Sequence, residues 1–139
     1  MEKRAAKKVP GLNVQWPWSQ LILSGKKTVE TRSYKLPELY LGKKLAIIET
    51  PGKRRGRPDK ASIVGLVTFS KSFRYKSRKE WLLDRSRHLV DEHDPLFCWD
   101  SNREKWGWVI SEVMVFQRPV GAPVRKGITF SKSCMVPKV

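Results

Sequence analysis

The feature that most constrains the fold of this chain is a series of short apolar runs. These runs are rich in β-branched and aromatic residues, and Gly and Pro separate them. Runs of this length are typical of strands packed on a core, and they leave little room for long helices. Gly65, inside one of them, predicts a bulge or bend where the sheet curves. The strands that we expect are 13–16, 27–34, 45–48, 61–73, 106–116 and 128–131.

Two segments between these strands carry helix signals instead. Residues 17–25 begin with Pro17, suited to a first helical turn, and end with Gly25, suited to the left-handed position that stops a helix. Residues 77–90 open with a capping box formed by Ser77 and Glu80. The side chains expected to face the core are Trp18, Leu21 and Ile22 in the first helix and Leu82, Leu83, Leu89 and Val90 in the second. The pattern predicts an α+β, mainly β fold: a small, curved, mixed-direction β-barrel with two or three flanking helices.

The charge balance points to the class of partner. The 139 residues include 29 Lys and Arg against 13 Asp and Glu, a net charge of +16. Self-repulsion of this size does not stabilise a fold, so it favours a polyanion, RNA or single-stranded nucleic acid, as the partner. An anionic membrane is the other candidate, but it would call for a long amphipathic helix or a lipidation site, and we find no lipidation motif. An adaptor for an acidic protein is a further alternative.

The chain length fits one domain. Residues 1–12 carry four cations against Glu2 and end at Pro10 and Gly11, so we expect a flexible basic N-terminal arm followed by a single domain over residues 13–139. No apolar run reaches the length of a membrane span and no secretory signal is present. We therefore expect a monomeric cytoplasmic protein, or a nuclear one if the source is eukaryotic.

One stretch resembles a known family. The run from Gly25 to Arg32 has the pattern G-x-K-x-x-E-x-R, in which Lys27 and Glu30 occupy the inner fixed positions. This pattern is similar to the signature of the ASCH domain, a member of the PUA-like superfamily. The helix of residues 16–23 before it, and Trp-Gly-Trp at 106–108 after it, follow in the order expected for that family. The resemblance spans about residues 13–131 and implies a PUA-like β-barrel with an RNA-related role.

Alternation along the expected strand places Glu30 and Arg32 on one face. Lys27 has the opposite parity, but it follows the turn at Gly25 closely enough to reach a shared cleft, where we expect it partly exposed. In the functional interpretation, Lys27 and Arg32 face a phosphate or a base edge and Glu30 orients them or accepts from a base amine. In the structural alternative, Glu30 and Arg32 form an ion pair that only orders the strand, with Lys27 in solvent.

A second basic feature is the segment 53–60, in which five cations face one Asp between Gly and Pro residues. The loop is expected to contact a nucleic-acid backbone through Lys53, Arg54, Arg55 and Arg57; a merely solvated loop is the alternative. Six Trp residues offer faces for base stacking, and we expect Trp18 and Trp108 to line the cleft. Core packing is the alternative for each of them. A further candidate for nucleic-acid binding is the outer face of the second helix, which carries Arg78, Trp81, Arg85 and His88. The alternative is that Trp81 packs against a neighbouring strand.

An enzyme is the rival class. The resemblance implies two possible activities, because some ASCH proteins are N4-acetylcytidine amidohydrolases and others are described as ribonucleases. In the amidohydrolases, a Lys, a Thr three residues later and a distant Glu carry out the reaction. Lys27 matches the Lys, but Glu30 occupies the Thr position, so the pattern departs from that of the amidohydrolases. If the protein is an enzyme, Lys27 and Glu30 are the expected catalytic pair. His88, His93, Cys98 and Cys134 lack a familiar zinc spacing, and we expect neither a metal nor a cofactor.

Overall fold

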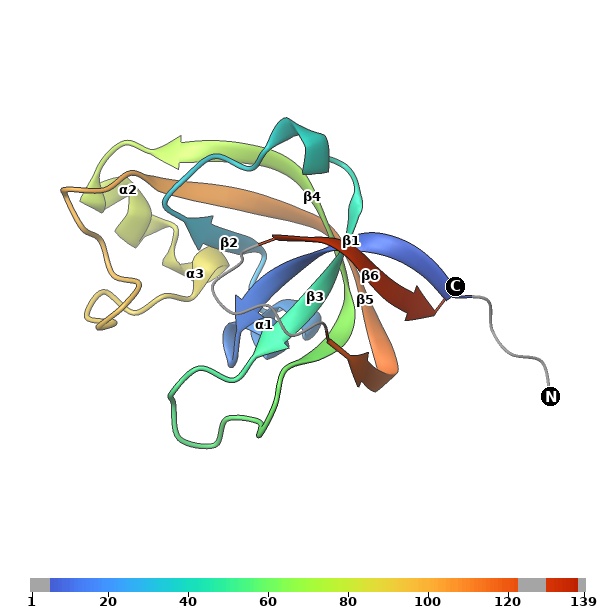
Figure 1. The fold of residues 1–139 in the computed structure, drawn as a ribbon. Helices are drawn as coiled ribbons and strands as arrows, with labels where there is room; N and C mark the ends of the chain where they lie inside the picture. Colours follow the sequence, from blue (N-terminus) through green and yellow to red (C-terminus); the bar gives the residue numbers. More distant parts are fainter. Residues whose placement is uncertain (1–5, 123–129, 138–139) are drawn as a thin grey trace.

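The computed structural model describes residues 6–122 and 130–137. Its described part contains one six-stranded mixed sheet with the strand order β2-β5-β4-β3-β1-β6 (Figure 1). Strand β1 runs parallel to β3, and the other pairs are antiparallel. The strands are β1 (Ala6–Gln15), β2 (Val29–Arg32), β3 (Lys44–Thr50), β4 (Ser62–Tyr75), β5 (Lys105–Gly121) and β6 (Phe130–Pro137). The expected α+β, mainly β class is confirmed.

The sheet is curved (Figure 1), but among the described residues it does not close, so the prediction of a barrel is wrong in this respect. Its edge strand β2 is only four residues long and pairs with β5 alone. On the other side, the pairing of β1 with β6 ends at Leu12 and Phe130. A side chain crosses the remaining gap, because Arg32 Nη2 donates to the carbonyl oxygen of Asn13, the next residue of β1, at 2.8 Å.

The expected flexible arm is also wrong for its described part. Residues 6–12 belong to β1, which lies between β3 and β6 in the sheet. Val9 and Leu12 are buried, so this segment contributes to the core. Gly11 is needed there because a Cβ atom would lie 2.5 Å from Cys134 Sγ. The Pro10–Gly11 pair thus marks a close approach of strands instead of a boundary, and residues 1–5 of the expected arm lie outside the described residues.

Helix α1 (Trp18–Leu23) follows β1, and Gly25 with φ 81° ends the segment as expected. Pro17 occupies the N-cap position, one residue earlier than the first-turn position that we expected. After β2 the chain makes a short 3-10 helix, η1 (Glu38–Tyr40), before β3.

The second predicted helix is two helices, α2 (Arg78–Leu83) and α3 (Arg85–His88), at one end of the sheet (Figure 1). One half of the predicted capping box is confirmed, because Ser77 Oγ accepts from Glu80 N at 3.1 Å. The other half differs, since Glu80 Oε2 accepts from Lys76 N at 2.7 Å instead of from Ser77 N. The predicted core stripe is wrong at Leu83, which is 77% exposed. Trp81 and His88 are both fully buried, so the proposed nucleic-acid face loses its aromatic residue.

Gly65 lies at shifts in the β3–β4 and β4–β5 registers, which confirms the predicted bulge. A Cβ atom at this position would lie 2.3 Å from the Met114 carbonyl oxygen, so only Gly allows the two strands to approach. The main core cluster includes Leu12, Phe69 and Trp108. None of the helices in the described ranges is long and apolar enough to cross a membrane.

Candidate nucleic-acid or nucleoside site

A pocket of about 180 Å³ opens where the motif strand β2 faces the ends of β1 and β3. Helix α1 and the segment after α3 complete its walls. Its lining residues are Asn13, Gln15, Trp18, Lys27, Glu30, Thr31, Arg32, Thr50, Val90 and Phe97. Four of the residues predicted from the motif and its preceding helix therefore come together: Trp18, Lys27, Glu30 and Arg32.

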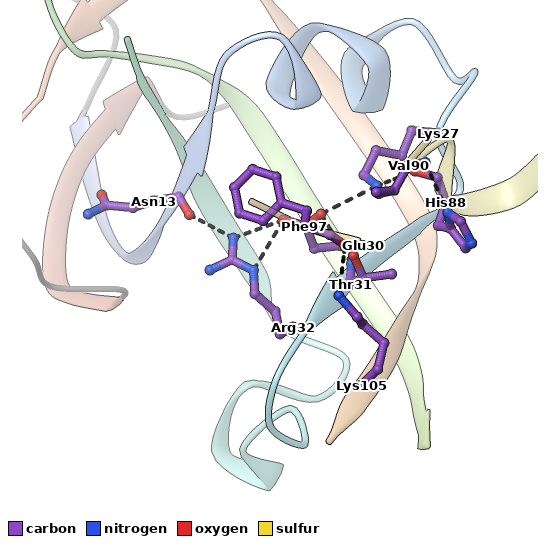
Figure 2. A network of polar contacts seen from close by, with 9 residues as sticks. All are labelled: Asn13, Lys27, Glu30, Thr31, Arg32, His88, Val90, Phe97 and Lys105. Atoms are coloured by element: carbon purple, nitrogen blue, oxygen red, sulfur yellow. Dashed lines mark hydrogen bonds and ion pairs between the residues drawn. The ribbon is translucent and has the colours of Figure 1, made fainter. Parts of the chain in front are cut away.

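Lys27 enters the pocket from the turn before β2 and is only 1% exposed, which contradicts the expected partial exposure. Its Nζ donates to the carbonyl oxygen of His88, lies 3.6 Å from Glu30 Oε1, and lies 5.1 Å from the centre of the Trp18 ring (Figure 2). Burial lowers the pKa of the Lys27 ammonium, although the neighbouring Glu30 carboxylate acts in the opposite direction. Lys27 is therefore a desolvated amine with one carbonyl acceptor, that of His88, and one ion-pair partner, Glu30.

Glu30 is enclosed by donors. Its Oε1 accepts from Thr31 N at 3.2 Å, and its Oε2 accepts from Arg32 Nε at 3.2 Å and Nη2 at 2.8 Å. Burial raises the pKa of the Glu30 carboxyl, but the charges of Arg32 and Lys27 outweigh it, so the pKa lies below its usual value. Figure 2 shows Arg32, Glu30 and Lys27 joined in a row by these contacts. The carboxylate is thus ionised and its lone pairs face protein groups.

Trp108 does not line the pocket, which corrects its assignment as a ligand-stacking residue. It is fully buried, and its Nε1 donates to the carbonyl oxygen of Tyr34 at 3.1 Å. The Trp108 residue pairs with Glu30 across β2 and β5, and the Arg32 guanidinium carbon lies 5.5 Å from its ring centre. Its place is under the pocket, where it supports Arg32.

The basic loop between β3 and β4 reaches the edge of the same pocket through Arg54. The Arg54 guanidinium carbon lies 5.5 Å from the centre of the Trp18 ring, and Nη2 donates to Asp94 Oδ2 at 2.7 Å. The other predicted loop cations, Lys53, Arg55 and Arg57, are exposed. The structure thus separates one loop Arg that is built into the fold from three cations that face solvent.

Sequence reasoning missed the segment after α3. Val90 and Phe97 both line the pocket, and the Phe97 ring meets the Trp18 ring edge-on with centres 6.1 Å apart. The backbone N–H groups of Leu96 and Phe97 donate to Asp94 Oδ1, each at 2.9 Å. An Asp followed by Pro in an otherwise irregular stretch was a signal for such a turn, but it did not indicate which surface the turn covers.

Other residues that had suggested chemistry lie elsewhere. Trp81 is buried and stacks on His88 with ring centres 4.8 Å apart. The described ranges contain no cluster of three or more His, Cys, Asp or Glu side chains placed to bind a metal ion.

Comparisons with known proteins bear on the fold. No family model matches the chain, and no curated protein matches it. Among solved structures, crystal structures of an ASCH protein from Zymomonas mobilis and of two of its single-residue variants superpose with TM-scores of 0.67 to 0.68. They are 14 to 15% identical to this chain and cover 88% of it and 85 to 88% of their own lengths. The chain therefore has the fold of the ASCH domain, the fold that its Gly25–Arg32 motif implied.

Proposed function

We propose that this protein binds RNA or single-stranded nucleic acid, with one base in the pocket and the backbone along the basic loop. The observation that carries the proposal is the shared position of Trp18. Its ring lines the pocket beside the Lys27 ammonium and also lies under the Arg54 guanidinium of the loop. A base in the pocket would therefore have its flanking phosphates close to the loop cations.

The distribution of charge supports the same surface. Residues 76–105, which include α2 and α3, carry seven Lys and Arg against seven Asp and Glu. The rest of the chain carries 22 Lys and Arg against 6 Asp and Glu, so the whole net charge of +16 lies outside this segment. Several Arg of the segment are paired, such as Arg85 with Asp91 and Arg87 with Asp84. Of the residues outside this segment, the ones that the structure describes carry 17 Lys and Arg against 5 Asp and Glu, a net charge of +12. This positive charge favours the approach of a polyanion to the sheet and its basic loop.

The pocket itself offers both contacts that an unstacked base uses. Trp18 and Phe97 supply aromatic surface for stacking. Lys27 and Arg32 add positive charge that exceeds the single charge of Glu30, whose oxygens already accept from protein donors. The pocket therefore favours ligands that are rich in hydrogen-bond acceptors.

The loop is tested by replacing its three exposed cations, Lys53, Arg55 and Arg57, with Ala. If all three contact phosphates, the slope of log K against log salt for a single-stranded oligonucleotide flattens by roughly 2, since each contact contributes about 0.7. Fluorescence anisotropy with labelled oligouridine over a series of salt concentrations measures this slope. An unchanged slope means that the loop is only solvated.

The matched control removes three exposed cations from the opposite end of the same strands: Lys43, Lys44 and Lys71. Lys44 pairs with Thr68 at the start of β3, whereas the basic loop follows the end of that strand. The two sites are about 20 Å apart at roughly 3.3 Å per strand residue. The control is expected to change the slope less than the loop variant, although both lose the same net charge.

A second candidate function is hydrolysis of a modified nucleoside. The specific observation is the buried Lys27 with its lowered pKa, 3.6 Å from an ionised Glu30. A lysine of lowered pKa can serve as a base or nucleophile at neutral pH. Incubation with N4-acetylcytidine, followed by detection of released acetate, tests this function. Intact nucleoside together with oligonucleotide binding identifies a binding protein; acetate release that Lys27→Met abolishes identifies an enzyme.

A further inference from the structure

The Lys27 ammonium depends on an acceptor from outside its own strand. That acceptor is the carbonyl oxygen of His88, at the end of α3. The neighbouring carbonyl, of Arg87, accepts from Thr28 N at 3.0 Å. Two successive carbonyl groups at the end of α3 therefore fix the chain that enters β2, and one of them fixes the pocket cation.

The His88 ring sets the position of this carbonyl. Its Nδ1 accepts from Val90 N at 2.9 Å, so Nδ1 carries no hydrogen and the hydrogen lies on Nε2. Nε2 then donates to the carbonyl oxygen of Trp81 at 2.7 Å, and the Trp81 ring stacks on the imidazole. Both ring nitrogens are used, and the arrangement requires a neutral imidazole.

From this geometry we infer that His88 is a positioning residue for Lys27 and that its protonation switches the pocket off. The inference rests on the proposed function for its binding readout. A proton on Nδ1 would place a second donor against Val90 N–H, so that contact must break. The turn at Leu89, which has φ 62°, joins His88 to the pocket residue Val90. Its movement displaces both the carbonyl that binds Lys27 and one wall of the pocket.

The charged groups around His88 fix the pH range. Lys27 and Lys105 oppose a charged imidazole, Asp84 favours it, and Tyr75 meets the ring edge-on without a charge of its own at neutral pH. Burial lowers the pKa of the imidazole. The hydrogen bond to the Trp81 carbonyl oxygen raises this pKa, but by less than burial lowers it. The folded protein therefore keeps His88 neutral at physiological pH, and the switch operates below the ordinary histidine pKa of about 6.5.

The direction of the effect separates this mechanism from ordinary electrostatics. A basic protein normally binds a polyanion more tightly as pH falls, because histidines gain positive charge. Protonation of His88 has the opposite effect, since it disrupts the pocket. The chain contains only one other histidine, His93, whose side chain is 83% exposed and which provides the matched control.

The binding experiment compares the parent, His88→Asn and His93→Gln with rhodamine-labelled oligouridine at about pH 7.5 and about pH 5. Uracil has no group that titrates in this range. An Asn amide oxygen can replace Nδ1 as the acceptor for Val90 N and does not titrate. We expect affinity to fall by about fivefold or more on acidification in the parent and in His93→Gln, and to stay level or rise in His88→Asn. A parent affinity that rises at low pH, or an equal fall in His88→Asn, overturns the inference.

A second measurement on the parent protein needs neither a variant nor a nucleic acid. Nuclear magnetic resonance follows the His88 ring and the Lys27 side-chain signals across the same pH range. We expect the Lys27 signals to shift with the midpoint of His88 and not with that of His93. Lys27 signals that ignore the His88 titration refute the positioning role. Coupled signals without oligouridine binding at any pH refute the proposed function alone.

Discussion

Replacement of Lys27 by Met tests whether the buried cation serves the ligand or only the fold. Met keeps most of the side-chain volume and removes the charge and the donor. The His88 carbonyl then loses its buried donor, at a cost of about 1–3 kcal/mol. Two effects reduce the loss: the burial penalty of the ammonium disappears, and Glu30 keeps Arg32 and the Thr31 backbone N–H as partners.

The net loss of stability is therefore near the low end, about 1–2 kcal/mol, or a fall in Tm of roughly 3–10 °C for a chain of this length. Affinity for oligouridine should fall at least about tenfold, or 1.4 kcal/mol. Thermal unfolding and anisotropy on the same preparation measure the two effects, and Lys26→Met provides the control because Lys26 is exposed. A folded Lys27→Met variant that binds like the parent refutes the assignment of Lys27 to the ligand pocket.

Two further predictions concern the carboxylate and the bulge. Glu30→Gln should lower stability by about 3 kcal/mol by leaving Arg32 without its buried anion. The low Glu30 pKa means that its contribution is present above the unfolded pKa of about 4.3 and is lost as pH falls, so melting curves of parent and variant should converge in acid. Gly65→Ala should cost about 3 kcal/mol by forcing a Cβ against the Met114 carbonyl. Gly121→Ala, which meets nothing within 4 Å, should change the melting temperature much less.

Local signals predicted the elements of the fold well where one residue type decides the backbone. Gly25 ends its helix segment, Ser77 caps α2, and Gly65 marks the bulge, because each depends on neighbours in sequence. The errors arose where distant contacts decide. Residues 6–12 read as a basic arm, yet two neighbouring strands recruit them into the sheet. The sequence of residues 6–12 does not indicate that β3 and β6 pair with them.

The site was predicted only in part for the same reason. The motif placed Lys27, Glu30 and Arg32 together, but alternation along β2 could not show that Lys27 would be fully buried. That burial depends on His88, which is 61 residues away in sequence. Trp108 of β5 pairs with Glu30 of β2, so the two side chains lie on the same face of the sheet. Trp108 is nevertheless fully buried, beneath the pocket that Glu30 lines. Face assignments predict neighbours, whereas depth depends on what packs above them.

The choice between a structural ion pair and a ligand site at Glu30 and Arg32 is not exclusive. Arg32 Nη2 contacts both Glu30 and the Asn13 carbonyl oxygen, so one guanidinium orders the motif strand and bridges the open edge of the sheet. The pocket lies at this same edge, where Asn13 and Arg32 are both lining residues. A ligand that binds there contacts groups that already connect β1 to β2, so binding should also stabilise the sheet edge. Protection of the β2 amides from hydrogen exchange should therefore increase when oligouridine binds, and unchanged protection would separate the ligand site from the edge.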